Sequence, residues 1–74
     1  MTHLPQVSGK DVIKALGRIG FEITHAKGSH FYMIRKGSGL VCVPVHANRD
    51  LPIGTFRSIL RQAGITLEEF LENS

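Results

Sequence analysis

Apolar residues near the start of the chain recur at the spacing of one helix face. They are Val12, Ile13, Leu16 and Ile19. This spacing predicts a helix from about Ser8 to Ile19. Ser8 suits the position before the helix, where its hydroxyl accepts a hydrogen bond from an exposed N–H, and Gly20 suits the helix end. The first predicted element is therefore an amphipathic helix.

The period of the apolar and β-branched residues changes to two between Phe21 and Val45. Glycine-containing breaks fall at Lys27-Gly28 and at Lys36-Gly37-Ser38-Gly39. This pattern predicts three short strands in an antiparallel meander, the last of them from Leu40 to Val45. Pro44 lacks the N–H that a strand ladder needs, so it indicates a sheet edge or a strand end there.

Helical spacing returns after Pro52. The apolar residues of this stretch are Ile53, Phe56, Ile59, Leu60 and Ala63, and Gly64 follows them as a cap. Thr66-Leu67-Glu68-Glu69 has the form of a capping box, which begins a short last helix with Leu67, Phe70 and Leu71 on its buried side. The element order predicts an α+β fold with the helices on one face of a three-stranded antiparallel sheet. We expect one domain over residues 1–74.

The turn between the first two strands brings histidines together. If Lys27-Gly28 forms the centre of a two-residue hairpin turn, Ala26 pairs with Ser29 and His25 faces His30 across the strands. Both imidazoles then share one face of the sheet.

The charge of the chain is unevenly distributed. The 74 residues hold nine Lys+Arg and six Asp+Glu, but three of the acids lie in the last seven residues. From Met1 to Ala63 nine basic residues stand against three acidic ones, a net charge of +6. A domain with this charge attracts polyanions. A solvated basic surface that binds no partner is an alternative interpretation, and charge alone favours neither.

The composition also indicates the cell compartment in which the protein is expected to reside. Apolar runs reach only four or five residues, as in Val41 to Val45, whereas a membrane helix needs about 20. The single cysteine, Cys42, cannot form an internal disulfide, and small secreted domains usually carry several. We therefore expect a cytoplasmic protein without a membrane segment.

Histidines are the groups that titrate near neutral pH, and the chain has four: His3, His25, His30 and His46. Their spacing matches no zinc motif, so we expect no metal and no other cofactor; a zinc ion on His25 and His30 is the disfavoured alternative. Lys27-Gly28-Ser29-His30 offers backbone N–H groups, a cation and an imidazole, a set that suits a phosphodiester. On these four residues alone, a plain hairpin turn with an exposed histidine is the alternative.

Five segments together resemble the HicA (YcfA-like) family of bacterial and archaeal toxins. They are Val7-Ser8-Gly9-Lys10-Asp11-Val12, Lys27-Gly28-Ser29-His30, Val43-Pro44-Val45-His46, Leu51-Pro52-Ile53-Gly54-Thr55 and Ile59-Leu60-Arg61-Gln62-Ala63-Gly64-Ile65. The resemblance runs from Leu4 to Leu71 in the same order and spacing. It implies a fold like that of double-stranded-RNA-binding domains (dsRBD-like), α-β-β-β-α, with the short C-terminal helix added. It also implies an endoribonuclease that cleaves mRNA without a metal and is held silent by a HicB-like antitoxin.

The family's functional histidine lies in a Gly-Ser-His motif, so the resemblance assigns the catalytic role to His30, with Gly28 and Ser29 as its motif neighbours. His25 matches no known family feature, and His46 matches a common position without a firm role. We interpret His46 as capping the loop before the second long helix. The turn Lys36-Gly37-Ser38-Gly39 departs from the His-Pro-Asp-Gly turn common in relatives, which affects the hairpin rather than the proposed site.

The candidates for binding RNA are Lys10, Lys14, Lys27, Gly28, Ser29, Arg35 and Lys36. The second proton-transfer group stays open between His25, Lys27 and the RNA itself, and Tyr32 or Phe31 is a candidate for stacking on a base. Other readings also stay open: a non-catalytic RNA-binding module, an inactive toxin relic that still binds its antitoxin, and a protein-interaction domain.

Overall fold

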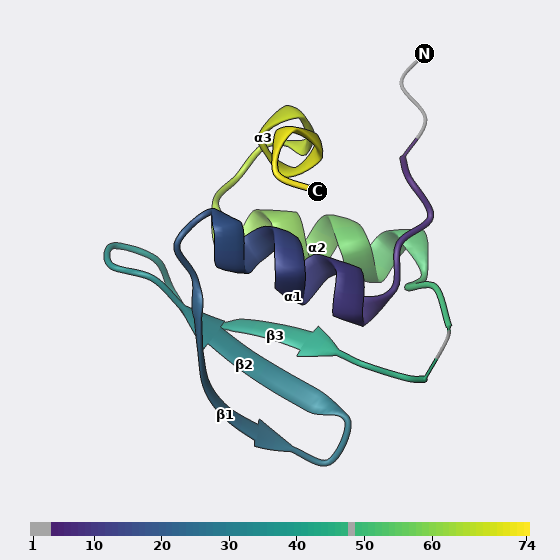
Figure 1. Cartoon of the computed structure of the whole chain (residues 1–74), viewed down its shortest axis with the longest axis horizontal. Coiled ribbons are helices and arrows are strands. Elements are labelled where there is room, and N and C mark those ends of the chain that lie inside the picture. The colour runs from purple at the N-terminus through teal and green to yellow at the C-terminus, as the bar shows by residue number, and fades with distance from the viewer. Residues whose placement is uncertain (1–3, 48) are drawn as a thin grey trace.

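The computed structural model describes residues 4–47 and 49–74, and these form three helices and three strands (Figure 1). The elements are α1 (Gly9–Arg18), β1 (Glu22–Lys27), β2 (His30–Ile34), β3 (Val41–Pro44), α2 (Ile53–Ala63) and α3 (Leu67–Glu72). The strands pair antiparallel in the order β1-β2-β3. The predicted α+β fold and its α-β-β-β-α order are therefore confirmed.

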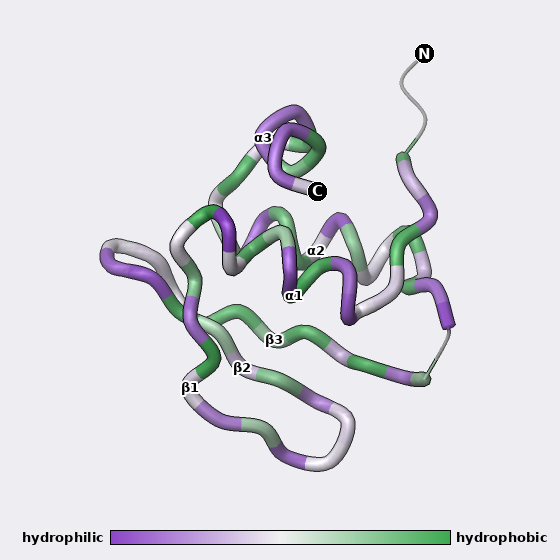
Figure 2. Tube along the Cα trace, in the orientation of Figure 1, coloured by the Kyte–Doolittle hydropathy of each residue, from purple (hydrophilic) through white to green (hydrophobic). Residues whose placement is uncertain are grey.

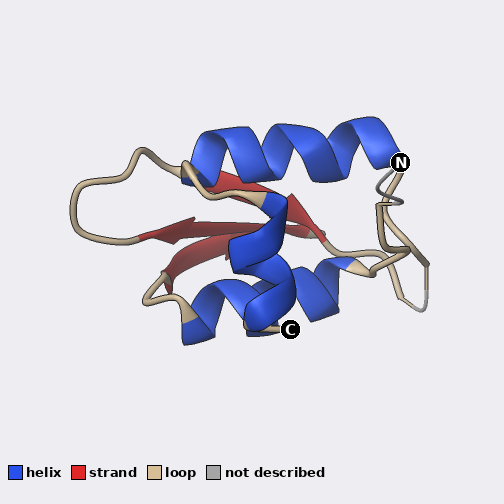
Figure 3. Cartoon of the chain, turned by 90° about the horizontal axis from the view of Figure 1, so that it is seen from above, coloured by secondary structure: helices blue, strands red, loops and turns tan. Residues whose placement is uncertain are grey.

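The elements form layers. Helices α1 and α2 lie over one face of the sheet, along its two sides, and α3 lies between them on the side away from the sheet (Figures 1 and 3). Side chains buried between the layers make one core, to which the sheet contributes Met33, Val41 and Val43. Figure 2 shows the corresponding gradient, from the hydrophobic β3 to the largely polar β1. In the part of the chain that the structure describes, no helix lies on the other face of the sheet, which we call the open face.

Helix α3 differs in part from expectation. The Thr66 hydroxyl accepts a hydrogen bond from the Glu69 N–H at 3.0 Å, which is half of the expected capping box. Phe70 is fully buried and packs edge-on against Phe56 of α2, with ring centroids 5.0 Å apart. The prediction that Leu71 is buried is wrong, because 44% of it is exposed. A helix of six residues buries only a narrow stripe of its surface against its neighbours, and Leu71 lies outside that stripe.

The start of α1 is held by a capping box, as the sequence predicts in part. The Ser8 hydroxyl accepts from the Asp11 N–H, and the Ser8 N–H donates to the Asp11 carboxylate, both at 3.1 Å. The backbone N–H of Ser8, followed by its side chain, holds the pKa of Asp11 below its ordinary value of 3.8. The folded chain therefore favours the ionised carboxylate.

Replacing Asp11 with alanine is expected to lower the free energy of unfolding by about 0.5 kcal/mol at pH 7. Because the pKa of Asp11 is lowered on folding, its contribution is full above 3.8 and is lost as the pH falls through the folded pKa. Urea unfolding at pH 7 and in acid measures both effects, with Glu72→Ala at the exposed end of α3 as the control. An Asp11→Ala penalty that persists unchanged in acid contradicts the expectation.

Gly9 brings the start of α1 against the end of β3. It is buried, and a Cβ at this position would collide with the carbonyl oxygen of Pro44 and lie 3.0 Å from the Cα of Val45. The preceding residue, Ser8, forms a bridge with Asp50. Only a residue without a side chain permits this approach.

None of the helices in residues 4–47 and 49–74 combines the length and the apolar character that crossing a bilayer requires.

Candidate active site on the open face of the sheet

The turn between β1 and β2 centres on Gly28-Ser29, so Lys27 pairs with His30 and His25 with Tyr32. The predicted turn centre at Lys27-Gly28 is wrong by one residue, and so is the direct pairing of His25 with His30. Gly28 has a φ of +59°. The first central position of the turn thus takes a left-handed conformation that glycine adopts readily, and this fixes the observed register.

A β-bulge changes the face on which His25 lies. The register of β1 shifts between Ile23 and His25, so that Thr24 is the extra residue opposite β2. Without the shift, simple alternation would pair His25 with Phe31, on the face that the helices cover. With it, His25 pairs with Tyr32 and shares the open face with His30. The expectation of a shared face is met, with the two histidines in diagonal positions.

Four residues share the open face at the turn end of the hairpin: His25 and Lys27 from β1, and His30 and Tyr32 from β2. We call them the open-face cluster. His25, Lys27 and His30 are exposed, and Tyr32 is half-buried. His25 and His30 are diagonal neighbours in the sheet, a relation in which residues lie about 7–8 Å apart. The cluster combines a cation and two imidazoles in reach of solvent.

His25 is held in place by two neighbours. Its ring stacks on that of Tyr32, with centroids 4.4 Å apart and planes at 11°. Its Nδ1 lies 2.9 Å from the hydroxyl of Thr24, which also donates to the carbonyl oxygen of Tyr32 at 3.2 Å. The ring is thus both exposed and oriented. Apart from the adjacency of Thr24 and His25, nothing in the sequence indicates this arrangement, because a β-bulge has no characteristic residue composition.

The turn end of the sheet is braced by β3 and α1. The N–H of Val45 donates to the carbonyl oxygen of Ser29 at 2.7 Å, and Pro44 pairs with His30. The contact of Gly9 with Pro44 places the first turn of α1 at the same end of the sheet, on the face that the helices cover (Figure 1). These contacts hold the backbone around His30 in place.

Two predicted RNA-binding lysines lie in a different layer. Lys10 and Lys14 are exposed on α1, which covers the face of the sheet opposite the cluster. Lys14 borders a hollow of about 280 Å³ between α1 and α3. Near that hollow, Arg18 donates to the carbonyl oxygen of Asn73 at 3.2 Å. The structure does not bring Lys10 or Lys14 next to His30.

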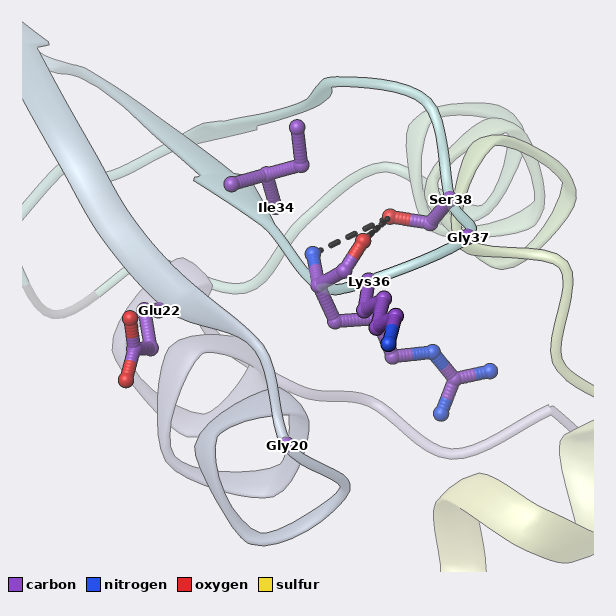
Figure 4. A pocket seen from close by; sticks show the side chains of 7 residues that line it. Gly20, Glu22, Ile34, Lys36, Gly37 and Ser38 are labelled. Atoms are coloured by element: carbon purple, nitrogen blue, oxygen red, sulfur yellow. Dashed lines mark hydrogen bonds between the residues drawn. The ribbon is translucent and has the colours of Figure 1, made fainter.

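Arg35 and Lys36 follow the far end of β2, which at about 3.3 Å per residue is roughly 13 Å long. The Arg35 guanidinium donates to the carbonyl oxygen of Ile19 at 3.2 Å and lies 4.8 Å from the centroid of the Phe21 ring. Lys36 borders a shallow hollow of about 520 Å³ beyond this end of the sheet (Figure 4). Arg35 therefore contributes to packing, and Lys36 stands apart from the cluster.

The turn after Lys36 is stabilised by Ser38. Its hydroxyl accepts from the Arg35 N–H at 3.1 Å and donates to the Arg35 carbonyl oxygen at 3.0 Å (Figure 4). Gly37 supplies the positive φ of +86°. This turn, which differs from the form expected of relatives, closes the hairpin far from the cluster.

The other candidate groups lie outside the cluster. His46 is exposed, and its carbonyl oxygen accepts from the Arg49 N–H at 3.1 Å; among the described residues, no side chain caps α2. The Cys42 N–H donates to Gln62 at 3.1 Å, which closes the outer edge of β3. His3 lies outside the described residues. Within residues 4–47 and 49–74 no three His, Cys, Asp or Glu side chains gather as metal ligands would.

Comparison with protein families gives one result. The family model for the HicA toxin of bacterial toxin-antitoxin systems matches residues 9–65, which include every strand, α1, α2 and the open-face cluster. A search of curated proteins finds no significant match.

Proposed function

Because the chain belongs to the family of HicA toxins of bacterial toxin-antitoxin systems, we propose that it is an endoribonuclease that cleaves mRNA with His30 at its catalytic centre. The observation that carries the proposal is the open-face cluster. It sets an exposed imidazole directly across the strands from Lys27, on a sheet face that none of the described helices covers.

The chemistry follows from what RNA cleavage without a metal requires. The ribose 2′-hydroxyl attacks the neighbouring phosphorus, and the 5′ oxygen leaves. The 2′-hydroxyl must lose a proton and the leaving oxygen must gain one, and a positioned imidazole transfers protons well near neutral pH. His30 takes part in one of these transfers, while positive charge stabilises the extra negative charge on the phosphorane.

Lys27, Gly28 and Ser29 are proposed to hold the phosphate that is cleaved. Lys27 is exposed beside His30, and the turn presents backbone groups at the same end of the hairpin. Lys10, Lys14 and Lys36 are exposed but distant from the cluster, and they are proposed to contact the RNA backbone away from that phosphate. We propose a packing role for Arg35, since its guanidinium is already bonded to Ile19.

We also propose that a HicB-like antitoxin silences the toxin in the cytoplasm, where mRNA is found. A basic body favours a partner with an acidic contact surface, since complementary charge speeds association and fixes orientation. A partner that covers the open-face cluster keeps RNA away from His30.

The decisive test uses two oligonucleotides of the same sequence, one of RNA and one with every 2′-hydroxyl removed. We expect cleavage of the RNA alone, with 2′,3′-cyclic phosphate and 5′-hydroxyl ends, because the attacking group is the 2′-hydroxyl. Cleavage is expected to persist in excess EDTA. Equal cleavage of both substrates contradicts the proposed attack, and salt-sensitive RNA binding without cleavage favours the non-catalytic RNA-binding module.

A further inference from the structure

The hydrogen bonds around Thr24 determine which nitrogen of His25 carries a proton. A hydroxyl has one hydrogen, and Thr24 donates it to the carbonyl oxygen of Tyr32, which can only accept. With that hydrogen donated to Tyr32, the imidazole is the donor in the 2.9 Å contact between the Thr24 oxygen and Nδ1 of His25; the other tautomer would need the same hydroxyl hydrogen. In this arrangement the proton of neutral His25 lies on Nδ1, and Nε2 keeps a free lone pair.

The position of the ring makes that lone pair available. Stacking on Tyr32 at 4.4 Å and 11° fixes the ring plane, and the bond to Thr24 fixes which edge points back to β1. The Nε2 edge is the opposite one, on a side chain that is exposed to solvent. An imidazole with a fixed tautomer, a fixed plane and an exposed Nε2 has the properties of a preorganised base.

We propose that His25 is the general base of the site, that His30 is its general acid, and that Thr24 is the positioning residue that selects the active tautomer of His25. This inference rests on the proposed function and names the second proton-transfer group of the reaction. The bulge at Thr24 supports it independently, because it places His25 on the open face beside His30. Bulges are common next to active sites, where they redirect a side chain.

The step balances as follows. Nε2 of neutral His25 takes the proton of the 2′-hydroxyl while the 2′ oxygen forms a bond to phosphorus. The bond from phosphorus to the 5′ oxygen breaks, its electron pair stays on that oxygen, and protonated His30 donates a proton to it. The products are a 2′,3′-cyclic phosphate, a 5′-hydroxyl, protonated His25 and neutral His30.

The diagonal arrangement of the two histidines suits this step. The attacking and leaving oxygens lie on opposite sides of phosphorus, so base and acid must approach from two sides. His25 and His30 occupy diagonal positions, a relation in which residues lie about 7–8 Å apart, so the two imidazoles can approach one phosphate from two sides. Lys27, directly opposite His30, is within reach of the remaining phosphate oxygens.

A substrate with sulfur in place of the 5′ oxygen separates the two roles, because a thiolate leaves without a proton. Replacing His25 with alanine is expected to slow cleavage about 10²–10⁴-fold on the ordinary and on the sulfur substrate alike. Replacing His30 with alanine is expected to slow only the ordinary substrate strongly. Exposed His46, outside the cluster, gives the matched control His46→Ala. Full activity of a folded His25→Ala variant, or its rescue by sulfur, overturns the assignment.

The role of Thr24 has a spectroscopic readout. Nitrogen-15 NMR of the free protein is expected to show His25 as the Nδ1–H tautomer, and Thr24→Val to shift the tautomer equilibrium about fivefold toward Nε2–H. Cleavage by Thr24→Val is expected to fall with that population, and Thr24→Ser to restore both. An unchanged tautomer in Thr24→Val overturns the positioning role.

The failure of this inference can be distinguished from the failure of the proposed function. If the unaltered chain does not cleave RNA, the proposed function fails. If it cleaves RNA and only His25 is dispensable, this inference alone fails.

Discussion

Replacing His30 with alanine is expected to abolish growth arrest and to slow RNA cleavage at least about 100-fold and up to about 10⁴-fold, because a general acid or base contributes that much. The imidazole is exposed on the open face, at the first residue of β2. Its loss removes little buried area, and surface substitutions usually change the free energy of unfolding by no more than about 0.5 kcal/mol. The effect is thus expected on catalysis and not on folding.

The measurement is gel-based cleavage of a labelled RNA, with circular dichroism and thermal unfolding as checks on the fold. RNA binding by His30→Ala is expected to stay close to that of the unaltered chain, since Lys27 and the other basic residues remain. His46→Ala serves as the control for removing an exposed imidazole near the same end of the molecule. If folded His30→Ala cleaves RNA at near the original rate, the catalytic centre lies elsewhere.

Replacing Gly9 with alanine is expected to be the most damaging of the glycine-to-alanine changes, with a loss of about 1–3 kcal/mol or more in the free energy of unfolding. The new Cβ would meet the carbonyl oxygen of Pro44 and the Cα of Val45, which are backbone atoms of the sheet and cannot rotate away. The helix must then shift from the end of β3. A domain of 74 residues has a total stability on the order of 4–11 kcal/mol, so this loss is a large share of it.

Gly17→Ala is the matched control, since Gly17 lies in the same helix with nothing within 4 Å of its would-be Cβ. Alanine there is expected to raise the free energy of unfolding by about 0.5–1 kcal/mol, because glycine is the poorer helix former. Thermal unfolding compares the two variants, at roughly 4–8 °C per kcal/mol for a domain of this size. A change of the same sign in both variants contradicts the packing explanation for Gly9.

Much of the fold is determined locally. The repeat of apolar residues in α1 and α2, the capping residues Ser8 and Thr66, and the glycine after α2 all act within a few neighbours, so the sequence predicted these elements within a residue or so. The order of the strands and their antiparallel pairing followed from short glycine turns. Leu71 was misplaced because burial at the edge of a short helix depends on where the neighbouring helices end.

The sequence also located the chemistry of the site, in that Lys27, Gly28, Ser29 and His30 lie together at one turn whichever register the strands adopt. It could not determine the partner of His25. A one-residue change of register and an extra residue at Thr24 each move a side chain to the other face of a strand, and neither alters the composition.

Contacts between distant segments were decided by the tertiary structure alone. The pairing of Arg35 with Ile19 and Phe21 turned a candidate RNA ligand into a packing residue, and the approach of Gly9 to Pro44 joined α1 to the strand beneath His30. Lys10 and Lys14 were placed in the helical layer, away from the cluster. Local sequence preferences act over a few residues, whereas these contacts depend on how separate elements pack, and so they become visible only in the folded chain.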